Sequence, residues 1–382
     1  MSALSLTLRG AEVLWPEGVG PGDLTVAGGR IGAGARGRVV DLTGFLVLPG
    51  LIDLHGDGFE HHLAPRRGAL DDLAAGLVSA EAELAAHGIT TAYLAQFLSW
   101  EGGMRGAGFA ARMLMALDAV RDTVATDLRA QLRLEVSGFE DYPALAAMVA
   151  RHGVGYVVFN DHLPHAALAR GRHPPRLTGQ ALKAGRSPEA HLALLQGLHA
   201  RMPEVPARLG PLAARLAAAG VRLGSHDDHG AADRAAAHAL GARIAEFPES
   251  IAAAEAARAM GDAVVMGAPN IVRGGSHKGN ADAREMVAMG LVDALASDYH
   301  VPSLARAAFC LVDEGIRDLP TAWALVSSGP ARIMGLTDRG ALVEGMRADL
   351  VVIAAATRRI EAVIAGGRVS YLAGEAAARF LG

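Results

Sequence analysis

The sequence predicts an α/β protein in which a (β/α)8 barrel of the TIM type carries a small β-sandwich domain made from both chain ends. Between residues 47 and 329, apolar segments of strand length alternate with Ala-rich segments of helix length. Residues 1–46 and 330–382 instead hold short alternating segments separated by Gly-rich turns. Because the two ends share this pattern, we expect them to pair into one domain beside a barrel domain.

The N-terminal region is predicted to form the short strands of a small antiparallel sheet. Apolar and polar residues alternate there, and Gly, Pro or Asp residues separate one segment from the next. The predicted strands cover residues 4–8, 11–14, 23–26, 30–31 and 39–42.

The central region contains the strands and helices expected of a barrel. Its candidate strands begin near residues 51, 89, 131, 154, 221, 244, 263 and 294. The segments between them are predicted helices, over residues 71–87, 106–128, 142–152, 188–219 (in pieces), 231–240, 250–260 and 282–289. Parallel strands joined by helices in this number are typical of a closed (β/α)8 barrel.

The C-terminal region returns to the short-strand pattern after Pro330. Residues 340–353 and 360–369 are predicted to form strands, the second around a Gly-Gly turn. These strands complete the expected β-sandwich.

Composition excludes several classes of function. The chain has 382 residues, 51% of them apolar, and a formal charge of −4, which gives no reason to expect nucleic acid or a membrane as partner. Its single cysteine excludes a disulfide framework and a cysteine metal cluster within one chain. No apolar run reaches the roughly 18 residues that span a bilayer, and no secretory signal is visible. We therefore expect a cytoplasmic protein.

Potential metal ligands stand where the predicted barrel strands end, which is the face where barrel chemistry occurs. His55 and Asp57 end an apolar strand, and residues two apart on a strand point to the same side. The other candidates at strand ends are Glu135, His162, His226 and Asp298. For Glu135 a salt-bridged strand residue is an equally good interpretation.

Imidazole and carboxylate ligands together suit one or two divalent ions, of which zinc is the first expectation and Mn or Mg the alternatives. A metal pair bridged by Glu135 and a water would generate hydroxide at neutral pH. The predicted catalytic residues are Asp298 and His226, with Asp298 as the general base.

A Gly-rich segment, residues 267–280, follows the predicted strand at 263–266. It predicts a cradle for an oxyanion, because backbone amides alternate there with cationic and polar side chains. The predicted substrate-binding residues in it are Asn270, Arg273, Ser276, His277 and Lys278. Arg66 adds a further guanidinium group, although a solvated basic turn remains open for it, as a flexible loop does for the segment.

Several motifs resemble a known family. Pro49-Gly-Leu-Ile-Asp-Leu-His-Gly-Asp57 and Gly345-Met-Arg-Ala-Asp-Leu-Val-Val352 resemble the amidohydrolase superfamily. Three further segments resemble its phosphonate-catabolism branch: residues 55–66, residues 225–228 with 244–248, and residues 266–277 with 297–299. The first metal motif of the superfamily is His-x-His, whereas this chain has His-Gly-Asp, which is typical of that branch.

The resemblance implies a metal-dependent diphosphatase of the C–P lyase pathway. Its substrate would be a phosphorylated ribose, a 5-triphosphate with a methylphosphonate at C1, cleaved to the 5-phosphate and pyrophosphate. The resemblance assigns the metal to His55, Asp57, Glu135, His162, His226 and Asp298, and phosphate contacts to Asn270, Arg273, Ser276 and His277. It leaves open a homodimer and contacts with other proteins of the phosphonate pathway.

Two alternatives remain. One is an amidohydrolase or deacetylase that cleaves a C–N bond in a phosphorylated or sugar substrate. The other is a protein without catalysis that holds a metal and scaffolds pathway partners, and we rank it last because the strand-end ligands are present.

Overall fold

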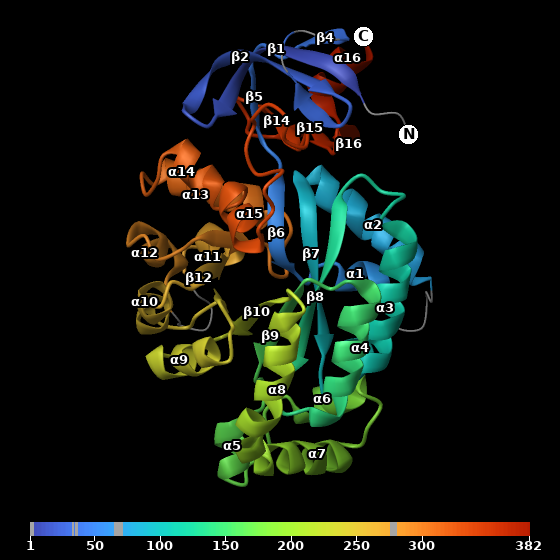
Figure 1. Ribbon diagram of the computed structural model, residues 1–382, viewed down its shortest axis with the longest axis vertical. Helices are drawn as coiled ribbons and strands as arrows, with labels where there is room; N and C mark the ends of the chain where they lie inside the picture. Colours follow the sequence, from blue (N-terminus) through green and yellow to red (C-terminus); the bar gives the residue numbers. More distant parts are fainter. Residues whose placement is uncertain (1–3, 33, 35–36, 65–71, 276–280) are drawn as a thin grey trace. The chain divides into compact units, whose positions relative to one another are not determined.

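The computed structural model describes residues 4–32, 34, 37–64, 72–275 and 281–382 (Figure 1). The chain divides into two compact units. Unit 1 comprises residues 1–94, 117–129 and 265–382, and unit 2 comprises residues 95–116 and 130–264. The division predicted from the sequence, with boundaries near residues 46 and 330, stays a prediction.

One sheet is made from both chain ends, as predicted (Figure 1). Its strands run in the order β16-β15-β14-β5-β1-β2-β3, with β4 paired to β1. The N-terminal strands are β1 (Ser5–Trp15), β2 (Gly18–Ala27), β3 (Arg30–Gly32), β4 (Arg38–Asp41) and β5 (Phe45–Pro49). The C-terminal strands are β14 (Leu350–Ala354), β15 (Ile360–Ala365) and β16 (Arg368–Leu372).

The two ends meet where β14 pairs antiparallel with β5, from Leu350 opposite Pro49 to Ala354 opposite Phe45. Alternate apolar residues of these strands face one core, in which Val47, Val352 and Ile364 are fully buried. A C-terminal helix that the sequence pattern did not reveal, α16 (Gly374–Leu381), adds Phe380 to this core.

The second sheet holds the eight parallel strands of the predicted barrel, in chain order from β6 to β13. Its strands are β6 (Leu51–Gly56), β7 (Ile89–Leu98), β8 (Asp127–Glu135), β9 (Tyr156–Asn160), β10 (Arg222–His226), β11 (Ile244–Glu246), β12 (Ala263–Gly267) and β13 (Ala294–Ala296). Every residue of β6, β7 and β9 is buried, as expected for parallel strands covered on both faces. This confirms the predicted fold class.

Helices connect these strands. The first are α1 (Glu60–Leu63), α2 (Leu73–Ala86), α3 (Ala107–Val120), α4 (Tyr142–His152), α5 (His165–Ala169), α6 (Leu177–Lys183), α7 (Pro188–Ala200) and α8 (Val205–Ala218). The later ones are α9 (Ala231–Ala239), α10 (Ile251–Ala259), α11 (Ala268–Arg273), α12 (Ala283–Ala288), α13 (Ser303–Asp313), α14 (Leu319–Ala324) and α15 (Ser328–Met334). Within the described ranges, no helix combines the length and apolar character needed to cross a bilayer.

Other elements also differ from the expectation. The helix predicted over 106–128 ends at Val120, where the Thr123 hydroxyl donates to the Val120 carbonyl at 2.8 Å, and the chain then becomes β8. The strand predicted from residue 340 begins only at Leu350. The segment predicted as a Gly-rich loop starts with helix α11, whose second residue, Pro269, has the fixed φ that favours a helix start.

Candidate metal centre

In unit 1, the end of β6 is joined to the residues that follow β13. The Asp298 amide donates to the His55 carbonyl at 2.8 Å, and the Asp57 amide donates to the Asp298 carbonyl at 2.9 Å. These bonds bring one donor atom each from His55, Asp57 and Asp298 to within 4.8 Å of one another. The predicted ligands of unit 1 therefore form one group, in which His55 is fully buried.

Asp53 supports this group from inside β6. Its carboxylate accepts from the Ser297 amide at 3.0 Å and from the Ser297 hydroxyl at 2.5 Å, although 244 residues separate the two. Burial raises the pKa of the Asp53 carboxyl, while the bonds from Ser297 act in the opposite direction. A Cβ atom at Gly56 would lie 2.7 Å from an Asp53 oxygen and 3.0 Å from the Ser297 hydroxyl. The close approach of β6 and β13 thus explains the glycine of His-Gly-Asp.

Asp298 adopts a left-handed backbone conformation, with φ at 55°. This conformation costs most residues about 1 kcal/mol or more and is tolerated best by Gly, Asn and Asp. The paired backbone bonds to β6 hold it, and the carboxylate thereby stays beside His55 and Asp57.

In unit 2, Glu246 at the end of β11 orients His226 at the end of β10. A Glu246 oxygen lies 3.3 Å from Nδ1 of His226. The other Glu246 oxygen accepts hydrogen bonds from the side-chain amide nitrogen of Gln131 and from the Tyr156 hydroxyl, both at 2.6 Å. A carboxylate on one ring nitrogen fixes the orientation of the ring. The other nitrogen, Nε2, lies 3.6 Å from an oxygen of Asp227. Glu246 lies in the strand predicted near residue 244, but the sequence did not predict this role.

Glu135 and His162 form the second pair of unit 2. Glu135 bonds Nδ1 of His162 through one oxygen and accepts from the His162 amide through the other at 3.0 Å. Burial acts to raise the pKa of Glu135, but its hydrogen bonds to His162 and the charge of that ring outweigh burial, so the pKa lies below its usual value. Glu135 therefore contacts the predicted ligand His162 and orients its ring.

Asp227 is a site candidate that the sequence did not single out. It follows His226 with φ at 59°, again a left-handed residue directly after a strand. One donor atom each from Asp227, His162 and His226 lies within 4.8 Å of the others. A signal was present in the sequence, because Asp227 belongs to the run Ser225-His-Asp-Asp-His229 at a strand end.

Arg133 is the second functional candidate that sequence reasoning missed. It lies on β8, two residues before Glu135, and only 4% of it is exposed. Its guanidinium group is 2.9 Å from Nε2 of His226 and stacks on the Phe97 ring at 4.0 Å from the ring centre. A buried guanidinium beside a group of candidate ligands provides positive charge for an anion in the site. Strand periodicity alone does not separate such an arginine from a salt-bridged one.

A hollow of about 990 Å³ accompanies the candidate residues of unit 2, whereas a hollow of about 570 Å³ in unit 1 is lined by other residues. The larger lies within unit 2 and is lined by the ends of β9 and β10, including Asp161, His226 and Asp227. It extends over apolar residues of α8, such as Val205 and Leu209. Space for a small molecule therefore adjoins the candidate ligands of unit 2.

The predicted anion-binding residues are only partly described. Asn270 and Arg273 lie in α11, where a guanidinium nitrogen of Arg273 donates to the Asn270 side-chain oxygen at 3.2 Å. Arg66, Ser276, His277 and Lys278 lie outside the described residues.

Both donor groups fit a divalent metal. Each combines imidazole nitrogens with carboxylate oxygens, which is the ligand set that zinc and related ions take in proteins. The group of unit 1 is His55, Asp57 and Asp298, and the group of unit 2 is His162, His226 and Asp227.

Comparison with known proteins gives the family. A sequence model of the amidohydrolase family matches residues 197–371. The chain is 35% identical over 360 residues to the alpha-D-ribose 1-methylphosphonate 5-triphosphate diphosphatase of Escherichia coli (strain K12), an alignment that covers 91% of this chain and 94% of the relative.

Solved structures share the fold. The beta-aspartyl dipeptidase of Fervidobacterium islandicum AW-1 matches with a TM-score of 0.60 at 16% identity, covering 97% of this chain and 98% of the other. The N-acetylglucosamine-6-phosphate deacetylase of Thermotoga maritima matches with a TM-score of 0.57 at 13% identity, covering 96% and 100%. The 35% identity to the Escherichia coli protein confirms the resemblance seen in the sequence, and this chain belongs to the amidohydrolase superfamily.

Proposed function

We propose that this protein is a metal-dependent diphosphatase that hydrolyses the triphosphate of alpha-D-ribose 1-methylphosphonate 5-triphosphate to the 5-phosphate and pyrophosphate. The observation that carries the proposal is the 35% identity to a diphosphatase of that name across 91% of the chain. The donor groups at the strand ends and the buried Arg133 support it, because a phosphoanhydride needs cations around its oxygens.

In this proposal His55, Asp57 and Asp298 would hold a metal ion in unit 1, and His162, His226 and Asp227 would hold one in unit 2. The metal supplies positive charge to phosphoryl oxygens and lowers the pKa of a water molecule.

The chain's own residues position the substrate and move its protons. Asp298 accepts the proton of the attacking water through a carboxylate oxygen, a position that its backbone bonds to β6 fix. Glu246 keeps the His226 ring in one orientation. Arg133 and Arg273 bind phosphate oxygens, and the fork-shaped guanidinium group matches their geometry.

A single assay tests the proposal. Purified protein with Zn²⁺ or Mn²⁺ is incubated with the ribose 5-triphosphate and, separately, with N-acetylglucosamine 6-phosphate. We expect release of pyrophosphate from the triphosphate and no acetate from the amino sugar. Cleavage of the amide with the triphosphate left intact would replace the proposal by the C–N hydrolase alternative.

A control variant separates catalysis by this chain from contamination. Glu140 is an exposed glutamate near the end of β8, so Glu140→Gln should retain the wild-type rate. Asp298→Asn, purified in the same way, should lose it.

A further inference from the structure

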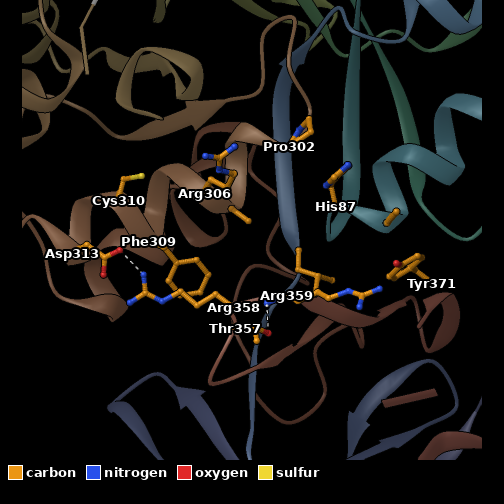
Figure 2. Close-up of a pocket in the computed structure, with 13 residues that line it drawn as sticks. His87, Pro302, Arg306, Phe309, Cys310, Asp313, Thr357, Arg358, Arg359 and Tyr371 are labelled. Carbon is orange, nitrogen blue, oxygen red and sulfur yellow. Dashed lines mark hydrogen bonds and ion pairs between the residues drawn. The ribbon is translucent and has the colours of Figure 1, made fainter. Parts of the chain in front are cut away.

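A hollow of about 570 Å³ lies within unit 1, and its lining includes none of the predicted site residues that the structure describes (Figure 2). It is formed by the end of α2, by α13, by the turn between β14 and β15, and by β16. Gly88, next to the lining residue His87, bonds the first residue of β6, since its carbonyl accepts from the Leu51 amide at 3.0 Å. The lining residue His87 is thus next in sequence to the partner of the first residue of β6, whereas His55 and Asp57 lie at or just after the end of that strand.

Arginines dominate the charge of this hollow. Arg306 comes from α13, and Arg358 and Arg359 come from the turn before β15 (Figure 2). Among the described residues that line the hollow, only Asp313 carries a carboxylate. Positive charge therefore exceeds negative charge, although the whole chain carries a net charge of −4.

Arg358 is held in place by two contacts. Its guanidinium group bonds Asp313 at 2.5 Å and lies over the Phe309 ring at 4.8 Å from the ring centre. Its φ of 57° is in the left-handed region, which is rare for a residue with a long side chain. The contacts with Asp313 and Phe309 offset this strain and fix one wall of the hollow.

Arg306 and Arg359 are differently placed. In the part of the chain that the structure describes, neither guanidinium group forms a hydrogen bond or ion pair, and both residues are exposed. They can therefore take an anionic ligand without first breaking an internal ion pair.

The remaining lining is apolar or uncharged. Pro302, Ala305 and Ile360 provide carbon surface between the cations. Burial lowers the pKa of His87, with its neighbour Glu83 acting in the opposite direction and His300 in the same one, which favours the neutral form of this ring. A ligand in this hollow would contact apolar side chains and guanidinium groups at the same time, which suits an organic molecule that carries a phosphate group.

We propose that this hollow binds an organic phosphate of nucleotide size, with phosphate oxygens on Arg306 and Arg359 and the organic body against Pro302, Ala305 and Ile360. Its volume lies within the range of about 300–1,000 Å³ that is usual for small-molecule sites. The site is separate from the proposed diphosphatase centre, because its lining shares no residue with the candidate ligands.

Calorimetric titration of metal-free protein with ADP tests the proposal, and adenosine serves as the probe without phosphate. We expect one equivalent of ADP to bind, and adenosine to bind at least about tenfold more weakly. Arg306→Ala combined with Arg359→Ala should weaken ADP binding by about tenfold or more. Asp313→Asn should strengthen it, because the change removes a negative charge from the lining while the Asn side-chain oxygen can still accept from Arg358.

Two controls make the outcome decisive. Arg332 is an exposed arginine on α15 outside the hollow, and Arg332→Ala should bind ADP as the wild type does. Arg273→Ala should also bind it normally, because Arg273 belongs to the proposed substrate site. Absence of ADP binding, equal binding by the double variant, or loss of binding in Arg273→Ala would each overturn the proposal. Circular dichroism of every variant establishes that the fold is kept.

Discussion

Asp298 and His55 are joined through their backbones, because the Asp298 amide donates to the His55 carbonyl at 2.8 Å. The Asp57 amide completes the pair by donating to the Asp298 carbonyl at 2.9 Å. The last barrel strand is thereby attached to the first at the point where the candidate ligands of unit 1 gather. The position of the Asp298 side chain therefore depends on peptide groups and on a left-handed backbone, with φ at 55°.

Asp298→Asn should abolish turnover and leave the fold intact. Asn tolerates the left-handed conformation and keeps both backbone bonds, but its amide cannot accept a proton as a base does. We expect kcat for pyrophosphate release to fall by about 100- to 10,000-fold. The free energy of unfolding should change by less than about 1 kcal/mol. Retained turnover would remove Asp298 as the base.

Glu135→Gln should weaken metal binding, because His162 loses the carboxylate that orients its ring. We expect metal affinity, measured by competition with a chromophoric chelator, to fall by about 10- to 100-fold. Glu140→Gln changes an exposed glutamate five residues along the chain and should leave the affinity unchanged. Wild-type affinity in Glu135→Gln would make the contact with His162 purely structural.

Arg133→Lys should raise the KM for the triphosphate by about tenfold while metal content stays at the wild-type level. Lysine keeps the charge but loses the fork of donors that matches phosphate oxygens. Steady-state kinetics and metal analysis of the same preparation separate the two effects. Exposed Arg151 on α4 provides the matched control, Arg151→Lys. A joint fall of metal content and kcat would show that Arg133 only supports His226.

Arg273→Ala should raise the KM for the triphosphate far more than the KM for a phosphate-free analogue. The guanidinium group at the end of α11 is partnered by the uncharged Asn270 side chain, so it retains its charge for an anion. We expect a change of about tenfold for the triphosphate. Equal changes for both compounds would assign Arg273 a structural role in α11.

Asp127→Asn should destabilise the protein at neutral pH. Asp127 accepts from Arg129 at 2.8 Å and from the buried Arg339 at 2.7 Å, and the variant leaves Arg339 without that carboxylate. Burial acts to raise the pKa of Asp127, but the two arginines outweigh it and hold the pKa below its usual value. We expect a loss of about 2 kcal/mol of unfolding free energy at pH 7.

The sign of the Asp127 effect can be checked against pH. A carboxyl whose pKa is lowered in the folded state stabilises the protein at pH values above its pKa in the unfolded chain, about 3.9. This stabilisation is lost as the pH falls through the pKa of the folded state. The difference between wild type and Asp127→Asn in urea unfolding should therefore shrink below about pH 4. A difference that does not depend on pH would show that lost packing, and not charge, causes it.

The fold class could be predicted because it depends on local patterns. The spacing of apolar residues in strands and helices repeats within a few residues, so the alternation of strands β6 to β13 with helices can be predicted from the sequence. The strand-end positions of His55, Glu135 and His226 follow from the same patterns. The sequence did not predict the helix that begins at residue 268. The glycines of this segment suggested a loop, and Pro269 is compatible with a loop as well as with the start of a helix.

The sequence by itself determined the barrel, the sheet made from both chain ends, and the residues that stand at the strand ends. The tertiary structure decided how those residues are partnered. It placed Arg133 against His226, 93 residues away, Glu246 against the same ring, and Asp53 against Ser297. Such pairs join strands that are distant in the chain, and their geometry depends on the register and closure of the sheet. The pattern of apolar and polar residues along a single strand does not encode that geometry.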